Sequence, residues 1–213
     1  MSERTTVHLV RHGEVFNPEK LLYGRLPGYR LSSLGEQMAM VVGEFLAKRD
    51  ITQVIASPLQ RAQQTAAPLA TLLGLPIGTD EHLLEATNVF EGKRVSVGDG
   101  VLKQPRAWRH LYNPFLPSWG EAYVEVAARM RVAVADARDA ARGHEAALVS
   151  HQLPIWVARL DAEKRRLWHD PRQRQCSLAS ITSLTFDGDA LTLITYSEPC
   201  ADLVAKSNKG VGA

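Results

Sequence analysis

The 213-residue sequence has few cysteines and almost no excess of charge. Its two cysteines, Cys176 and Cys200, are too few for a disulfide framework and lack the spacing of a metal-binding motif. A net charge of only +2 argues against binding to nucleic acid or to a membrane surface. We therefore expect neither of these as a partner.

Long hydrophobic runs are also missing. No stretch approaches the roughly 20 apolar residues that span a bilayer. The start, MSERTTVHLVRHG, lacks the apolar segment and small-residue cleavage site of a signal peptide. The remaining composition, 45% hydrophobic and 23% charged, predicts a soluble, cytoplasmic, single-domain protein with one well-buried core.

Stretches of strand length alternate with stretches of helical periodicity. We expect strands at residues 5–10, 53–57 and 145–151, and a hairpin at 180–196 that turns at Asp187-Gly188. Apolar residues recur at helical spacing in three segments between them, residues 33–49, 57–74 and 118–143. This alternation predicts an α/β fold with a mostly parallel sheet.

The helix starts carry N-terminal signals. SLGE (33–36) and SWGE (118–121) have the spacing of a capping box. Ser57 is expected to cap the helix between them, with Pro58 at its first position. Pro68 is expected to kink or divide that helix.

Two regions follow neither periodicity. Residues from about 90 to 117 are rich in glycine and proline, which predicts an irregular insertion within a single domain spanning 1–213. Its residues 106–110, RAWRH, are expected to be surface and packing positions, with a lid over the site as the alternative. The tail from about residue 200 is small and polar and is expected to be loose.

Polar side chains follow three of the expected strands. The first strand ends in Arg11 and His12, the second runs into Ser57 and a helix start that carries Arg61, and the third ends at His151. Ligands of open α/β sheets bind outside the carboxyl ends of the strands, so these side chains should converge. A guanidinium fork matches two phosphate oxygens, and a helix N-terminus favours an anion. The cluster predicts a phosphate site.

The segments that carry these residues resemble a known family. LVRHGE (9–14), SPLQRAQQTA (57–66) and LVSH (148–151) are similar to the signature blocks of the histidine phosphatase superfamily, in the branch that contains cofactor-dependent phosphoglycerate mutase. LLE…FEG (83–92) and WGEAYVEVAARM (119–130) extend the resemblance over most of the chain. It implies a phosphoglycerate mutase-like three-layer sandwich and a small phosphorylated metabolite as substrate.

The resemblance also implies a role for each site residue. His12 would attack phosphorus and carry the phosphoryl group. Arg11, Arg61 and His151 would hold the phosphoryl oxygens and stabilise the transition state. Glu85 would act as general acid and later activate water. No metal ion or other cofactor is implied.

Outer contacts with the substrate are expected from the loop after the first strand. Asn17 comes one residue earlier than the family's asparagine and is a candidate for the phosphate. Gly24 and Arg25 are candidates for an outer group, although a solvated loop residue is the favoured interpretation of Arg25. Glu14 can either orient the site through an ion pair or touch the substrate.

The sequence departs from the family pattern at positions that shape the pocket. Val15 replaces a usual threonine or serine, Gln152 a usual glycine, and Ala122 a usual serine. The block after Glu85 is one residue shorter than usual and lacks its glycine and tryptophan. None of these changes removes a residue of the expected phosphate site.

The remaining histidines, basic residues and Met130 are interpreted as structural or solvated positions. His12 and His151 lack further ligands at metal-site spacing, and the neighbouring arginines would repel a cation, so we reject a metal site. The basic run 164–174, KRRLWHDPRQR, is expected to be a solvated face. His8 and Met130 are expected in the core.

Three functions fit the sequence. A metal-independent phosphatase that hydrolyses a phosphomonoester through phosphohistidine at His12 is favoured. A phosphoglycerate mutase is the alternative, although it must shield the phosphohistidine from water, which usually takes larger closing segments. The third is a non-catalytic module that binds a phosphorylated ligand.

Overall fold

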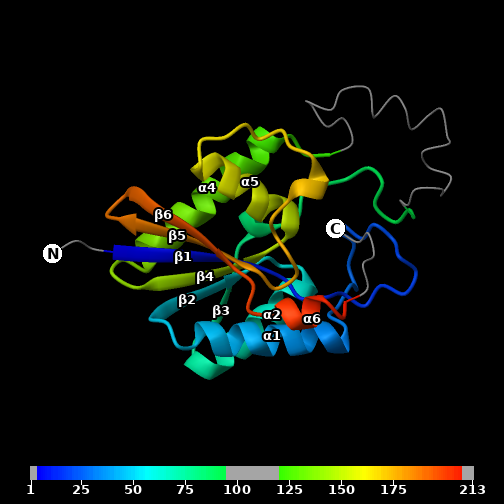
Figure 1. Ribbon diagram of the computed structural model, residues 1–213, viewed down its shortest axis with the longest axis horizontal. Coiled ribbons are helices and arrows are strands. Elements are labelled where there is room, and N and C mark those ends of the chain that lie inside the picture. The colour runs from blue at the N-terminus through cyan, green and yellow to red at the C-terminus, as the bar shows by residue number, and fades with distance from the viewer. Residues whose placement is uncertain (1–3, 95–119, 208–213) are drawn as a thin grey trace.

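The computed structural model describes residues 4–94 and 120–207, which form a six-stranded mixed sheet between two layers of helices (Figure 1). The strands are β1 (Arg4–Arg11), β2 (Ile51–Ala56), β3 (Ile77–Thr79), β4 (Glu145–Ser150), β5 (Ile181–Asp187) and β6 (Ala190–Ser197). Their order is β3-β2-β4-β1-β5-β6. The four strands from β3 to β1 are parallel, whereas β5 and β6 are antiparallel to their neighbours.

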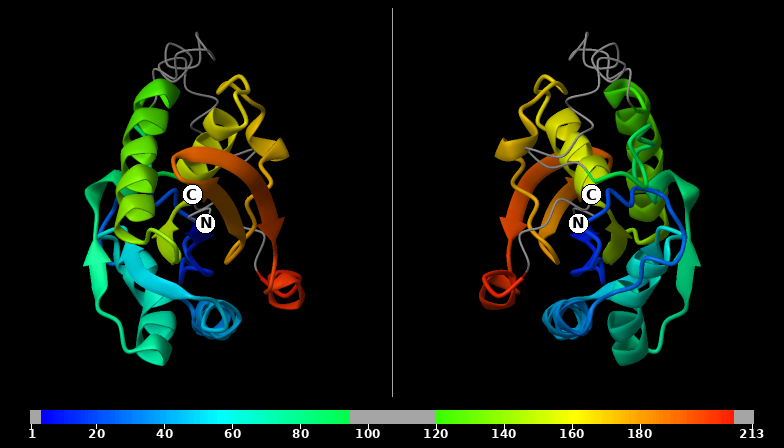
Figure 2. Two further views of the ribbon diagram at one scale, coloured as in Figure 1. Left: turned by 90° about the vertical axis from the view of Figure 1, so that its left-hand side faces the viewer. Right: turned by 90° about the vertical axis from the view of Figure 1, so that its right-hand side faces the viewer.

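Helices cover both faces of this sheet, as the end-on views of Figure 2 show. One face carries α1 (Ser33–Leu46), α2 (Gln60–Leu73) and the short α6 (Ala201–Val204). The other carries α4 (Tyr123–Ala140) and α5 (Gln152–Ala162), and two 3₁₀ turns, η1 (Glu81–Leu83) and η2 (Pro171–Gln173), complete the described elements. The three-layer α/β arrangement expected from the sequence is confirmed.

The central strands are apolar on both faces because each face is covered by helices. In β1, Val7 and Leu9 pack toward α4 and α5, whereas Val10 packs toward α1 and α2. Met130, in α4, is fully buried as expected. His8 is also buried, where its ring nitrogens contact Ser183 Oγ at 2.8 Å and Glu145 Oε2 at 2.7 Å.

The expected helix starts are wrong in detail. Ser32, not Ser33, caps α1, and its hydroxyl accepts the Gly35 N–H at 3.0 Å. Helix α2 begins at Gln60, and Leu59 is its N-cap position, because the Ser57 hydroxyl contacts His151 instead of capping the helix. Pro68 does not divide α2, which continues to Leu73.

Helix α4 also begins later than expected. Ala122 is its N-cap position and makes no side-chain cap, while Glu121 precedes the helix and pairs with Arg25 and Arg129. Ser118, the other half of the expected capping box, lies outside the described residues. The helix ends at Ala140, a few residues before Gly143.

The hairpin follows the expectation from the sequence, whereas the tail does not. Gly188, at φ +57°, turns β5 into β6. The tail is not loose over residues 200–207, because Cys200 is buried and α6 packs Leu203 and Val204 against the α1–α2 side. Most of the expected insertion, including residues 106–110, lies outside the described residues. No helix within residues 4–94 and 120–207 is long and apolar enough to cross a membrane.

Candidate active site

The carboxyl ends of β2, β4 and β1 lie next to one another and bring the expected residues together. Arg11 pairs in register with Ser150, and Ala56 pairs with Val149, so the three strands end level. His12 and His151 follow directly, and their ring centroids are 5.1 Å apart. The expected convergence at one sheet edge is confirmed.

Five buried polar atoms in this cluster have no hydrogen-bond partner within the described residues. They are Arg11 Nε, His12 Nε2, Arg61 Nε, Glu85 Oε2 and His151 Nδ1. Leaving one such atom unpaired costs about 1–3 kcal/mol, so five around one spot mark a place for a polar ligand. The same part of the chain contains only three other atoms of this kind, on Thr52, Trp156 and Thr182.

His12 is held as a neutral ring with one nitrogen available. Its Nδ1–H donates to the Gly13 carbonyl at 2.8 Å, which leaves the lone pair on Nε2. Burial, together with Arg61 and Arg11, holds the pKa of His12 well below its usual range. Glycine is required next to it, because a Cβ at Gly13 would lie 2.6 Å from the carbonyl oxygen of Gly35.

His151 is oriented by Ser57. Its Nε2 lies 2.9 Å from the Ser57 hydroxyl, whereas Nδ1 has no hydrogen-bond partner within the described residues. Burial, then Arg61 and His12, lower the pKa of His151 well below its usual range. The neutral ring therefore leaves Nδ1 available to a ligand, as a donor when the Ser57 hydroxyl donates to Nε2.

Each of the two arginines is anchored at one Nη and has an Nε without a hydrogen-bond partner within the described residues. Arg11 donates from Nη1 to the Cys176 carbonyl at 2.7 Å, and Arg61 from Nη2 to the Gly24 carbonyl at 2.7 Å. Arg61 is 1% exposed and stacks over the Tyr23 ring at 4.8 Å. Burying two cations side by side is costly, which makes the cluster a receptor for an anion.

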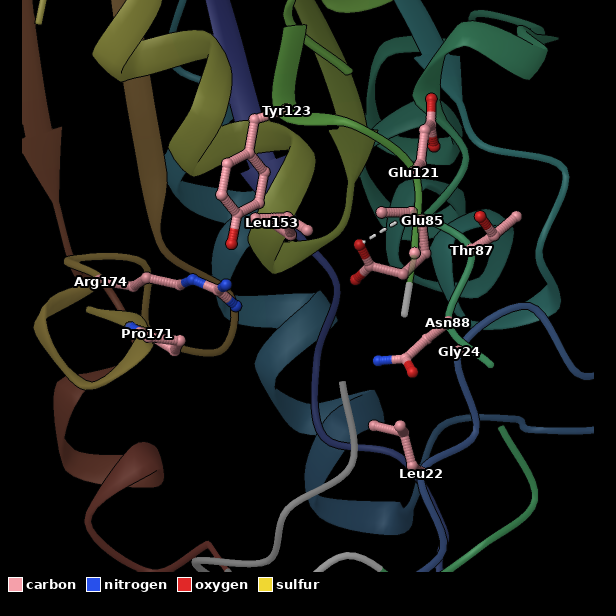
Figure 3. Close-up of a pocket in the computed structure, with 12 residues that line it drawn as sticks. Leu22, Gly24, Glu85, Thr87, Asn88, Glu121, Tyr123, Leu153, Pro171 and Arg174 are labelled. Atoms are coloured by element: carbon pink, nitrogen blue, oxygen red, sulfur yellow. Dashed lines mark hydrogen bonds between the residues drawn. The ribbon is translucent and has the colours of Figure 1, made fainter. Parts of the chain in front are cut away.

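Glu85 presents a carboxyl oxygen to the same region. Its Oε1 accepts the N–H of Ala86 at 2.9 Å, while Oε2 is unpaired (Figure 3). Burial raises the pKa of Glu85, and the Ala86 N–H and Arg61 partly oppose this. A buried carboxyl with a raised pKa can hold a proton at a pH where an exposed one cannot.

The comparison with known proteins agrees with this geometry. A model of the histidine phosphatase superfamily (branch 1) matches residues 7–199. The chain belongs to this superfamily. Its members bind phosphorylated small molecules.

Two relatives are similar to this chain over most of its length. The uncharacterized protein Rv0525 of Mycobacterium tuberculosis (strain H37Rv) is 58% identical over 94% of this chain and 100% of its own. The probable phosphoglycerate mutase GpmB of Salmonella choleraesuis (strain SC-B67) is 32% identical over 82% of this chain and 83% of its own.

A solved structure also matches. The mycobacterial glucosyl-3-phosphoglycerate phosphatase Rv2419c superposes with a TM-score of 0.72 and 27% identity, over 91% of this chain and 96% of its own. A second structure of that phosphatase is a complex with VO3.

The loop residues expected to touch substrate are engaged within the protein. Asn17 bonds the backbone of Leu21 through both its amide nitrogen and its amide oxygen, which closes a local turn. Gly24 is buried at φ +40° and contributes its carbonyl to Arg61. Glu14 Oε2 accepts the Ser32 hydroxyl at 2.5 Å, which ties it to the start of α1.

Arg25 is not a solvated loop residue. Its Nε donates to the backbone carbonyl of Glu85, and its Nη2 lies 3.0 Å from Glu121 Oε2. Glu121 in turn binds the guanidinium group of Arg129 at 2.7 Å. The chain Arg129–Glu121–Arg25 therefore fixes the segment that carries Glu85.

A pocket of about 120 Å³ opens beside Glu85, and the sequence did not predict most of its lining (Figure 3). Besides Glu85, its polar side chains are those of Thr87, Asn88, Glu121, Tyr123 and Arg174, and Leu22 and Leu153 form part of its apolar wall. The placement of Arg174 corrects the expectation for residues 164–174, because this side chain is partly buried and burial lowers its pKa. Nothing in the run itself distinguished Arg174 from its exposed neighbours.

Within residues 4–94 and 120–207, no group of three histidine, cysteine or acidic side chains is close enough to hold a metal ion.

Proposed function

We propose that the protein is a phosphatase that hydrolyses a phosphomonoester through a phosphohistidine at His12 Nε2. The observation that carries the proposal is the set of five unpaired polar atoms to which this nitrogen belongs. The neutral state of His12, favoured by its lowered pKa, keeps the Nε2 lone pair available for attack.

In the first step, Nε2 attacks phosphorus and the bond to the alcohol oxygen breaks. Arg11, Arg61 and the Nδ1–H of His151 bind the three remaining oxygens, where charge accumulates in the transition state. Glu85 gives its proton to the departing oxygen, so the product leaves as an alcohol.

In the second step, water attacks the phosphohistidine. The Glu85 carboxylate takes a proton from this water and the N–P bond breaks. Inorganic phosphate is released, and His12 returns to its neutral state. Both guanidinium groups stay charged throughout, so the proposed reaction requires no metal ion or other cofactor. The likeness to a phosphatase that forms a complex with VO3 supports the same assignment.

The direct test is to trap the intermediate. Wild-type protein mixed with ³²P-labelled phosphomonoester and quenched in alkali should carry label on His12, and His12→Ala should carry none. Turnover should persist in EDTA, and vanadate should inhibit it strongly as a transition-state mimic. Full loss in EDTA that Mg²⁺ or Zn²⁺ restores would contradict the proposal.

A phosphoglycerate mutase is the second candidate, favoured by the likeness to GpmB. Interconversion of 2- and 3-phosphoglycerate, measured with and without 2,3-bisphosphoglycerate, separates it from phosphate release. Ligand binding with neither reaction would identify a non-catalytic module instead.

A further inference from the structure

The pocket beside Glu85 contains a positively charged side chain, Arg174, that has no part in the proposed reaction. In Figure 3 the Arg174 guanidinium group and the Tyr123 hydroxyl point into it from one side, and the Glu85 carboxyl and Asn88 amide from the other. Leu22 and Leu153 add apolar surface. The pocket borders the unpaired Glu85 oxygen, so the alcohol part of a bound phosphomonoester would enter it.

Arg174 is positioned by neutral groups. Its Nε donates to His169 Nε2 at 2.9 Å, so this ring nitrogen is unprotonated, and the His169 Nδ1–H donates to the Leu167 carbonyl at 2.7 Å. Its Nη1 lies 3.4 Å from the amide oxygen of Gln152. These contacts aim the guanidinium group into the pocket without neutralising its charge.

We infer that Arg174 binds a carboxylate on the alcohol part of the substrate, with the apolar body of that alcohol against Leu22 and Leu153. The inference rests on the proposed phosphatase function. A carboxylate matches the planar guanidinium fork, and Tyr123 and Asn88 offer further donors. A second phosphate dianion fits less well, because Arg174 is the only cationic side chain among the described lining residues of the pocket.

The test compares two ligands that differ only at one end, where the carboxylate of the first is an uncharged carboxamide in the second. They are 4-(carboxymethyl)benzylphosphonate and its neutral amide, 4-(carbamoylmethyl)benzylphosphonate, neither of which can be hydrolysed. Calorimetric titration of the wild type should show at least about tenfold tighter binding of the carboxylate, as expected for a charge-assisted hydrogen bond. In Arg174→Gln this ratio should fall to about twofold or less.

Two further variants control the result. Arg172→Gln removes an arginine two residues away that is 89% exposed, paired with Asp170 and absent from the pocket wall, so the wild-type ratio should be retained. Arg174→Lys keeps the charge but loses the fork, so the ratio should be intermediate. Equal binding of the two ligands by the wild type, or an unchanged ratio in Arg174→Gln, overturns the inference.

Turnover of the corresponding aryl phosphates separates this inference from the proposed function. For 4-(carboxymethyl)phenyl phosphate, Arg174→Gln should raise KM at least about tenfold and change kcat much less, because the lost contact is made in the bound ground state as well. If no phosphate ester is hydrolysed but the binding ratio depends on Arg174, the carboxylate assignment stands and the phosphatase assignment fails. Hydrolysis without such a dependence supports the phosphatase assignment and overturns the carboxylate assignment.

Discussion

The candidate site has two halves that differ in burial. One half lies at the ends of central strands and the start of α2 and is almost completely buried; it consists of Arg11, His12, Arg61 and His151. Under the proposed function they bind the phosphate, and we call them the phosphate-binding half of the site. The outer half consists of Asn88, Tyr123 and Arg174, which come from two loops and the first turn of α4 and are all partly exposed.

Under the proposed function, the phosphate-binding half carries out the reaction and the outer half selects the substrate. Side chains on a rigid sheet edge can be held to the tolerance that phosphoryl transfer needs, whereas loops can change without disturbing the core. Glu85 belongs to a loop by its backbone but is buried like the phosphate-binding half, and Arg25 fixes it there. Substitutions in the two halves should therefore fail in different ways.

The largest effect is expected from His12→Ala. Loss of the nucleophile removes the covalent step, so kcat/KM should fall by at least about 10³-fold on every phosphomonoester, whatever its alcohol. Steady-state assays on p-nitrophenyl phosphate and on an alkyl phosphate measure this. Activity within tenfold of the wild type would refute the assignment.

Glu85→Gln should distinguish between substrates. An alkoxide leaves poorly without a proton, so kcat/KM on an alkyl phosphate should fall by about 10²–10⁴-fold, whereas p-nitrophenolate leaves readily and should show a much smaller loss. Because the pKa of Glu85 is raised by burial, wild-type activity on the alkyl ester should decline as pH rises through that pKa. Equal losses on both substrates would mean that Glu85 positions phosphate rather than donating a proton.

Arg25→Gln tests whether Arg25 acts through Glu85. It should reduce kcat/KM on the alkyl phosphate by about tenfold and on p-nitrophenyl phosphate less, because a misplaced acid matters only where a proton is needed. The same change in a Glu85→Gln background should have little further effect. Arg30→Gln, at an exposed loop position, is the matched control. A loss of equal size on both esters would contradict this role.

The smallest expected effects are on stability. Its dependence on pH has one sign for His12 and His151 and the opposite sign for Glu85. His12 and His151 have lowered pKa values, so the unfolded state gains protons first as pH falls below about 6.5. The free energy of unfolding should then drop by up to about 1.4 kcal/mol per histidine and pH unit. Glu85, with a raised pKa, should stabilise the fold at low pH and lose that contribution as pH rises.

Urea unfolding of the wild type at pH 7.5 and 5.5, in buffer without phosphate, measures the histidine effect. His12→Asn and His151→Asn should each weaken the pH dependence, and His144→Asn, at an exposed position, is the control. A pH dependence that is the same in all variants would show that the buried histidines do not cause it.

The fold and the phosphate-binding half were predictable because their signals are local or follow from sheet topology. Continuous apolar runs marked β1 and β4, and polar residues directly after them had to meet at one edge once the strands were parallel. The choice of Glu85 required the family resemblance, since the residues alone did not distinguish it from Glu81 or Glu91.

The predictions from the sequence were wrong where tertiary contacts compete with local conformational preference. Ser57 has the sequence context of an N-cap, but its hydroxyl contacts His151 and the helix begins three residues later. Cys200 follows the last strand in a polar tail, yet it is buried because α6 packs back onto the α1–α2 side.

The sequence by itself determined the α/β class, the three parallel strand ends and the convergence of Arg11, His12, Arg61 and His151 there, because strand burial and polar strand ends are encoded in consecutive residues. Only the tertiary structure decided what surrounds them. Arg25 binds the Glu85 backbone across 60 residues of chain, and Arg174 meets Glu85 in one pocket from a run that looked uniformly solvated. Such contacts depend on how loops fold over the sheet edge, which no periodicity along the chain encodes.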